Sequence, residues 1–250
     1  KAGDALYLPV AVTSAVAAVQ GGQVIDFPPV ADQLATNVVA LGASASSGLA
    51  VTFSVAGWPA SIDGNVLRFT GAGTVSVVAS QPGDANWSAA PEKTNSFAVA
   101  KAGATVALTN LLQTYDGTPR AVTAATVPEG LAVSVLYGDR QSMSVGGSGV
   151  APVLAGSYAV SGTVVDDFYS GRATGTLVVA KADQAIDFPP VAGQLATNVV
   201  ALGANASSGL DVTFSVAGGP ASIDGNDLRF TGAGTVSVVA SQPGDANWSA

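Results

Sequence analysis

Polar and apolar residues alternate along much of the chain with a period of two, the period of a half-buried β-strand. The clearest example is residues 51–55, where Val51, Phe53 and Val55 would share one face of a strand. No stretch shows the 3.6-residue periodicity of an amphipathic helix. Within residues 23–102 the pattern predicts strands at 24–27, 37–43, 50–56, 66–70, 73–80 and 95–100.

Turn sequences separate these strands, for example Asp63-Gly64-Asn65, because Gly, Asn and Asp tolerate the backbone angles that tight turns need. Six or seven short strands in ~80 residues predict an antiparallel β-sandwich of immunoglobulin-like size. A second region follows the same rules, with strands predicted at 105–109, 121–127, 131–137, 156–166 and 175–180. The predicted fold class is therefore all-β, with tandem immunoglobulin-like antiparallel β-sandwich modules arranged in a rod.

An internal repeat sets the domain organisation. Residues 23–89 recur at 184–250, an offset of 161 residues, and only six of the 67 aligned positions differ. The two complete units end alike, at Lys101-Ala102 and Lys181-Ala182, which suits short linkers. We therefore predict module A at 23–102, module B at 103–183, and a third module at 184–250 that repeats module A without its final strand. The differing pairs are Val24/Ala185, Asp32/Gly193, Ser44/Asn205, Ala50/Asp211, Trp58/Gly219 and Val66/Asp227.

The opening stretch, residues 1–22, matches the end of module A. Residues 3–7 align with 83–87, and after a one-residue gap residues 12–22 align with 93–103. The stretch is therefore interpreted as the last turn and final strand of an A-type module. Its even positions are mostly apolar and form the predicted self-assembly strand, namely Leu6, Leu8, Val10, Val12, Val16 and Ala18.

Two interpretations of the chain's ends follow. In the first, the 250 residues are a window cut from a longer repeat array, and both ends are accidents of the cut. In the second, copies of the chain join head to tail, and residues 6–19 of one copy fill the missing strand position in the third module of its neighbour. The expected partners are accordingly copies of the chain itself or neighbouring repeats of the same chain.

Composition excludes several functions. The chain has a net charge of -8 and only nine Lys and Arg residues, which are scattered, so we expect no nucleic-acid binding. It has no Cys and no His, which removes thiolate or imidazole metal sites and Ser–His or Cys–His nucleophile pairs. No uncharged stretch reaches the ~20 apolar residues of a spanning helix, so no membrane insertion is expected.

Carboxylates are the remaining candidates for site chemistry. The turn aspartates and the Asp166-Asp167 pair could in principle bind a hard cation, but they are isolated, and Ca²⁺ needs several converging oxygens. An acid–base pair is equally absent, since Glu occurs only at Glu92 and Glu129. We therefore predict no catalytic residue, no metal site, no cofactor and no enzyme activity. The turn aspartates, which cap the local backbone in this interpretation, are Asp63, Asp84, Asp224 and Asp245.

The three tryptophans fall into two groups. Trp87 and Trp248 occupy the same repeated Gly-Asp-Ala-Asn-Trp turn, which favours a packing role. Trp58 has Gly219 as its counterpart, and a residue that one copy dispenses with is not expected in the core. Trp58 is therefore predicted to be exposed, and it is the candidate contact for a ligand.

Several segments carry a resemblance to a known family. Residues 113–122 (QTYDGTPRAV), residues 155–182 and the long repeat from 183 to 250 resemble the bacterial immunoglobulin-like and MBG-type repeats of large extracellular surface adhesins. The resemblance covers nearly all of residues 23–250, and it implies an extracellular, bacterial cell-surface location.

Two functions remain open from the sequence. The first is structural: a stalk segment or self-assembling surface filament subunit, joined head to tail by residues 6–19. The alternative is an adhesin segment that binds a cell-surface glycan or protein through module B or around Trp58. The two differ in whether the chain associates with itself or with a foreign ligand.

Overall fold

The computed structural model describes residues 11–139 and 147–250, and all regular structure in these residues is β-strand. The all-β prediction is therefore confirmed. The chain divides into two compact units, one of residues 1–102 with 167–169 and one of 103–166 with 170–250. Among the described residues no helix is long and apolar enough to cross a bilayer.

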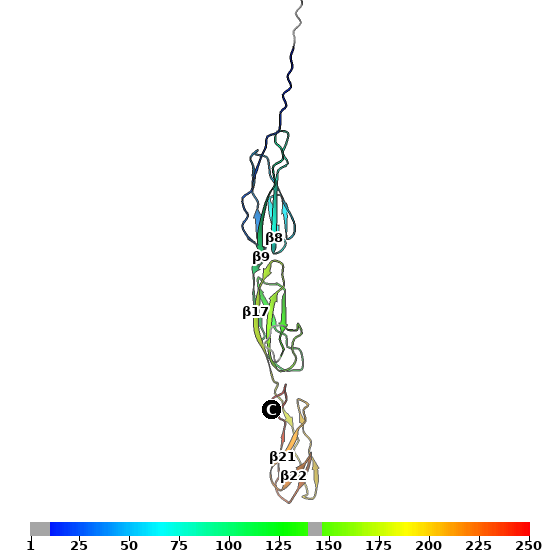
Figure 1. The fold of residues 1–250 in the computed structure, drawn as a ribbon. Helices are drawn as coiled ribbons and strands as arrows, with labels where there is room; N and C mark the ends of the chain where they lie inside the picture. The colour runs from blue at the N-terminus through cyan, green and yellow to red at the C-terminus, as the bar shows by residue number, and fades with distance from the viewer. Residues whose placement is uncertain (1–10, 140–146) are drawn as a thin grey trace, which may run out of the picture. The chain divides into compact units, whose positions relative to one another are not determined.

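The main sheet of module A has four strands in the order β2-β9-β8-β5, and Figure 1 shows β8 beside β9. Its long central strands exist because alternate residues are apolar, so that one face of each is buried. The neighbours pair antiparallel except β2 and β9, which are parallel. The strands span Gln33–Leu34 (β2), Lys93–Ala100 (β9), Gly73–Ser80 (β8) and Thr52–Val55 (β5).

Two smaller sheets complete module A. One contains β3 (Val38–Ala40), β7 (Val66–Phe69) and β6 (Ala60–Asp63), and the other pairs β1 (Ile25–Asp26) with β4 (Ser44–Ala45). The β6–β7 hairpin turns at Gly64, whose φ of 60° suits a residue without a side chain. The core between the sheets contains Leu67, Val75, Val77, Phe69 and Phe97 among its buried residues.

Module B repeats this plan with its own sequence. Its four-stranded sheet has the order β12-β17-β15-β14, and β12 runs parallel to β17 as β2 does to β9. A second sheet pairs β11 with β13, and the Tyr137 hydroxyl accepts a hydrogen bond from the Val122 N–H at 2.9 Å in the core. The strands are β12 (Leu112–Thr114), β17 (Arg172–Ala180), β15 (Gly156–Val164), β14 (Val133–Tyr137), β11 (Thr105–Thr109) and β13 (Thr123–Val127). Two short strands, β10 (Ala102–Gly103) and β16 (Tyr169–Ser170), stand where the chain passes between the two units.

The third module keeps the two small sheets of module A and loses most of the large one. Pairs β18–β20 and β19-β23-β22 correspond to β1–β4 and β3-β7-β6. In place of the four-stranded sheet there is only the antiparallel pair of β21 and β24. The strands are β18 (Ile186–Asp187), β20 (Asn205–Ala206), β19 (Val199–Ala201), β23 (Asp227–Phe230), β22 (Ala221–Asp224), β21 (Thr213–Gly218) and β24 (Ser237–Ser241).

The strands predicted from the sequence are present in modules A and B, within a few residues at each end. Val51, Phe53 and Val55 are half-buried and alternate with exposed Thr52 and Ser54, as the pattern predicted. Several features were not predicted. Strands β4, β6, β10 and β16 were missed, and the sandwich is not purely antiparallel, because β2 and β12 each add a short parallel edge to the final strand.

Candidate functional site

The final strand of module A, β9, shows what the third module lacks. Its inward side chains, Phe97 and Val99, are buried in the core, and the Phe97 ring meets Phe69 edge-on with centroids 6.2 Å apart. The strand pairs with β8 over seven residues and with β2 on its other side. Because β9 lies between the two strands, it joins them into one sheet.

Polar groups beside the sheet also hold β9. The Ala98 N–H donates to Asp32 Oδ1 at 2.8 Å, and the Asn95 side-chain amide donates to the Pro28 carbonyl at 2.6 Å. Hydrogen bonds to a charged acceptor are the stronger kind, so Asp32 is a specific anchor for this strand. Sequence reasoning missed Asp32, although the Asp32/Gly193 difference between the two copies was a visible signal.

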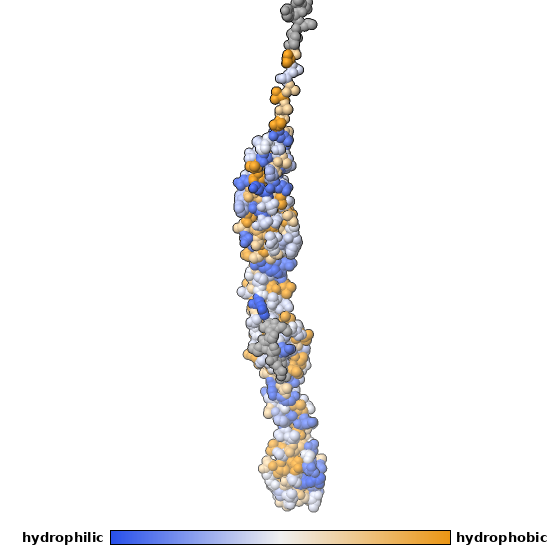
Figure 2. Space-filling model, in the orientation of Figure 1, coloured by the Kyte–Doolittle hydropathy of each residue, from blue (hydrophilic) through white to orange (hydrophobic). Residues whose placement is uncertain are grey.

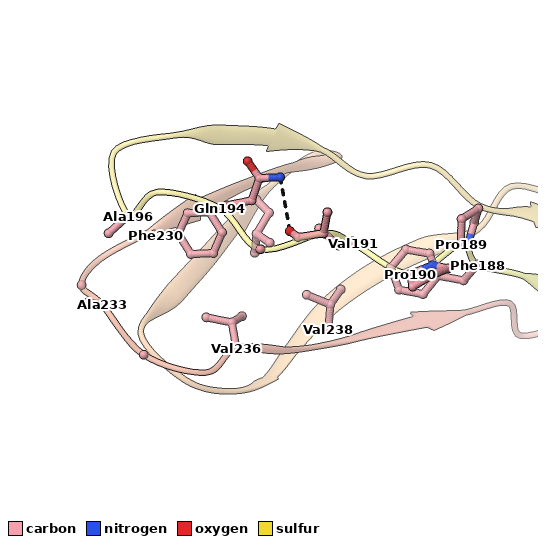
Figure 3. A pocket seen from close by; sticks show the side chains of 15 residues that line it. Phe188, Pro189, Pro190, Val191, Gln194, Ala196, Phe230, Ala233, Val236 and Val238 are labelled. Carbon is pink, nitrogen blue, oxygen red and sulfur yellow. Dashed lines mark hydrogen bonds between the residues drawn. The ribbon is translucent and has the colours of Figure 1, made fainter.

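In the third module the corresponding position is an open groove of about 470 Å³. It is lined by the counterparts of the residues around β9, among them Phe188, Val191, Phe230, Val236 and Val238, whose side chains Figure 3 shows around the gap. Apart from Gln194, the side chains that line the groove are apolar, and Gly193 is among the lining residues where module A has Asp32. The groove therefore lies at the position that β9 occupies in module A.

The open groove alters the strands around it. β8 begins at Gly73, but β24 begins only at Ser237, the counterpart of Ser76. In module A, residues 73–75 pair only with β9, so their counterparts 234–236 have no strand partner in the third module. The parallel edge strand β2 likewise has no counterpart strand at residues 194–195.

The groove also exposes what module A buries. Val75 and Val77 are 1% and 0% exposed, whereas their counterparts Val236 and Val238 are only half-buried. Ala35 is buried and its counterpart Ala196 is exposed. Exposed apolar residues beside an unpaired strand edge are a site for adding another strand.

The predicted self-assembly strand is exposed where the structure describes it. Val12, Val16 and Ala18 are exposed, Val12 at 89% and Val16 at 90%, and residues 11–20 belong to no strand. Figure 2 shows this hydrophobic segment extending beyond the body of module A. Leu6, Leu8 and Val10 lie outside the described residues. The assembly role of all six residues stays a prediction.

Trp58 is 72% exposed, in agreement with the expectation from its glycine counterpart. Gly219 cannot simply be exchanged for a larger residue, because a Cβ there would lie 2.2 Å from the Thr235 carbonyl oxygen. The local backbone therefore differs between the two copies. Whether Trp58 contacts a ligand stays a prediction.

Two turn aspartates have the local role that the sequence indicated. Asp84 Oδ1 accepts the N–H groups of Asn86 and Trp87, and Asp245 Oδ1 accepts those of Asn247 and Trp248. In residues 11–139 and 147–250, no group of three or more Asp, Glu, His or Cys side chains is placed to hold a metal ion. The absence of a metal or catalytic site remains an expectation from the sequence.

One region of the chain matches a known protein family. Residues 104–183 match the MBG domain family, so the MBG-type resemblance is confirmed for this region. No curated protein matches the chain.

The solved structures that match the chain include tandem cadherin repeats. Drosophila N-cadherin EC1-4 is 14% identical, with a TM-score of 0.25, and the match covers 83% of this chain and 66% of that one. Mouse cadherin-23 EC22-24 is 11% identical, with a TM-score of 0.29, and the match covers 87% and 92%. The fold assignment of this chain rests on its own strand pairing.

Proposed function

We propose that the chain is a structural repeat segment of an extracellular, bacterial-surface stalk or filament, and that copies join head to tail by strand donation. Residues 12–19, within the apolar segment 6–19, would occupy the open groove of a neighbour's third module. The observation that carries the proposal is the groove in the third module. It is lined by the counterparts of residues that pack around β9 in module A. The tandem modules and the MBG domain in the chain's middle fit a part that provides length.

The register of the donated strand follows from the linkers. Gly21 and Ala182 make the same pair of backbone hydrogen bonds to the Asn-Trp turn of the module that follows each of them. In module B the buried residues Leu177 and Val179 lie five and three positions before Ala182. Five and three positions before Gly21 are Val16 and Ala18, which therefore face inward in the proposed strand.

The same register sets the cross-strand neighbours. In module A, Val75 pairs with Phe97 and Ser76 with Ser96. By the repeat offset, Val236 would pair with Val16 and Ser237 with Ala15 of the donating copy. Each apolar side chain buried this way contributes ~1.5–3 kcal/mol. Ordering the segment opposes this gain at ~1 kcal/mol or more per residue, so main-chain hydrogen bonds to the open edge are needed as well.

The deciding experiment measures the mass of the 250-residue chain by light scattering and images it by negative stain. Long polymers are expected, and they should be lost in a variant without residues 1–22. A second control extends the chain beyond Ala250 with a copy of residues 90–102, which fills the groove in cis and should leave monomers. If the unmodified chain is monomeric at all concentrations, strand donation between copies is wrong, and the groove is filled by residues that follow in a longer chain.

Disulfide trapping tests the register. The Ser76 and Ser96 hydroxyl oxygens lie 2.7 Å apart, so cysteines at the corresponding positions are close enough to bond. The chain has no native cysteine. The double variant Ala15→Cys, Ser237→Cys should therefore form a covalent ladder on mild oxidation. The control Val16→Cys, Ser237→Cys places one thiol on the opposite face of the strand and should not; a ladder there would refute the register.

The exposure of Trp58 favours a second candidate function, binding of a cell-surface glycan or protein. An exposed indole is a large apolar platform of the kind that protein and sugar ligands use. A glycan array or a cell-binding assay with the full chain tests this function. Binding that is lost in Trp58→Ala would establish it, whereas binding unchanged by that substitution would remove Trp58 as the contact.

A further inference from the structure

The Gly-Asp-Ala-Asn-Trp turn occurs twice, at residues 83–87 and 244–248, and both copies have the same internal construction. Besides the aspartate caps described above, each begins with a glycine in the left-handed region, with φ of 81° at Gly83 and 76° at Gly244. A Cβ at either glycine would collide with the carbonyl oxygen of the turn's own tryptophan. The two turns therefore share one backbone conformation that requires the glycine, and both contain the same asparagine and tryptophan.

The linker before each turn also binds it in the same way. The N–H of Gly21 donates to the Asn86 carbonyl at 2.8 Å, and that of Ala182 to the Asn247 carbonyl at 2.9 Å. The side-chain amide of Gln20 donates to the Asp84 carbonyl, and the Lys181 ammonium to the Asp245 carbonyl. The hydrogen bonds between the linker and the turn are thus the same at both turns.

Among the described residues, the second turn also contacts the end of the preceding module. The Trp248 ring meets Tyr115 edge-on, with centroids 5.8 Å apart and an interplanar angle of 83°. Asn247 Oδ1 accepts the Ala155 N–H at 3.0 Å. Both partners belong to module B, and all four residues lie in the same compact unit. At the first turn, Asn86 is exposed where Asn247 is half-buried, and no aromatic ring of the described residues packs edge-on against Trp87.

We propose that the Asn-Trp turn is a docking surface that selects the end of a B-type module, and that Asn86 and Trp87 form a second, unfilled copy of it. The partner chemistry is the one seen at Trp248: the edge of a tyrosine ring at the position of Tyr115 and a free main-chain N–H at the position of Ala155. The contact at the Asn-Trp turn is complete only behind a B-type module. Residues 1–22 match an A-type end, and in a head-to-tail polymer an A-type third module would precede Trp87, so Trp87 has no aromatic partner in either case.

The position of Tyr115 explains the selection. Its N–H donates to the Ala180 carbonyl at the end of the final strand, just as the Ala35 N–H donates to Ala100 in module A. The strands around the two residues have the same register, so Ala35 and, by the repeat, Ala196 occupy the position of Tyr115 in the A-type modules. An alanine has no ring to offer, so the end of an A-type module lacks half of the contact.

The test replaces residues 1–22 of the full chain with a second copy of residues 103–183, so that a B-type end precedes Trp87. Trp58 and Trp248 are changed to Phe, which leaves Trp87 as the sole fluorophore because residues 103–183 contain no Trp. We expect the Trp87 emission to shift to the blue and its quenching by acrylamide to fall, relative to the same variant without the insertion.

Two matched variants make the result specific. Changing the inserted copy's counterpart of Tyr115 to Ala should restore the quenching, and so should replacing the insertion with residues 24–103, an A-type end, with its tryptophans changed to Phe. Circular dichroism confirms that each variant keeps its strands. Equal protection of Trp87 by both kinds of insertion would refute the selection, and no protection by the B-type insertion would refute the docking surface.

Discussion

Module A and the third module have almost the same sequence but differ in how much of it is buried. Leu41 and its counterpart Leu202, which does not line the groove, are both 5% exposed, so the part of the core away from the groove forms equally in both modules. Phe69, Val75 and Val77 are buried, while Phe230, Val236 and Val238 are half-buried around the groove. Because the six substitutions spare all of these positions, the difference in burial comes from the missing strand. One strand thus completes the core of a module.

The largest effect is expected from completing the third module in cis. Adding a copy of residues 90–102 after Ala250 supplies the counterparts of Phe97 and Val99 and should raise the free energy of unfolding of this module by about 3–6 kcal/mol, since each of these two buried side chains contributes ~1.5–3 kcal/mol. Hydrogen exchange measured by mass spectrometry reports the two modules separately. The peptide containing Val236 and Val238 should become as protected as the one containing Val75 and Val77; unchanged exchange there would mean that the groove is not a strand site.

The second effect comes from shortening paired core residues. Phe69→Ala should destabilise module A by about 3–5 kcal/mol, the usual range for a buried Phe, and Phe230→Ala should cost less than half as much in the third module. Leu41→Ala and Leu202→Ala serve as the control pair and should cost the same, because both leucines are buried and Leu202 does not line the groove. Denaturant unfolding of each variant, followed by module-resolved hydrogen exchange, measures the four values. Equal costs for the two Phe variants would show that the groove is closed in solution.

The repeat and the longer strands of modules A and B could be predicted from the sequence, because alternation and self-similarity are local or exact signals. The parallel edges β2 and β12 could not, since two or three paired residues carry no periodic pattern. Strand β6 was missed because Ala60–Asp63 has only one large apolar residue, Ile62, and follows Trp58-Pro59. The contact of Tyr115 with Trp248 was unpredictable for another reason: it joins distant residues through the ends of two modules.

The third prediction concerns the side chain that the proposed donated strand places beside Phe230. At the position of Phe97 the proposed strand has only Val16, so the site beside Phe230 is underfilled relative to module A. Val16→Phe restores the aromatic pair, which is worth about 1 kcal/mol, and should strengthen association between copies about 5-fold. Sedimentation velocity over a concentration series measures the change. Val19→Phe, on the opposite face of the strand, is the matched control, and an equal gain from both would indicate nonspecific hydrophobic association.

The smallest effect concerns the one substitution that touches β9. Asp32 anchors the Ala98 N–H in module A, so Asp32→Ala should destabilise module A by about 1 kcal/mol, the net value of a typical hydrogen bond.

The reverse substitution in the third module, Gly193→Asp, is sterically free, because a Cβ at Gly193 meets no atom within 4 Å. In the 250-residue monomer the new carboxylate has no strand to hold, and the stability of the third module should not change. In the chain completed with residues 90–102, the same substitution should add about 1 kcal/mol, because the added strand brings the Ala98 counterpart within reach. Denaturant unfolding of the four chains forms a double-mutant cycle. If Gly193→Asp raises the free energy of unfolding equally with and without the added strand, the aspartate acts on the groove wall. Its hydrogen bond to the final strand would then not be what distinguishes the two copies.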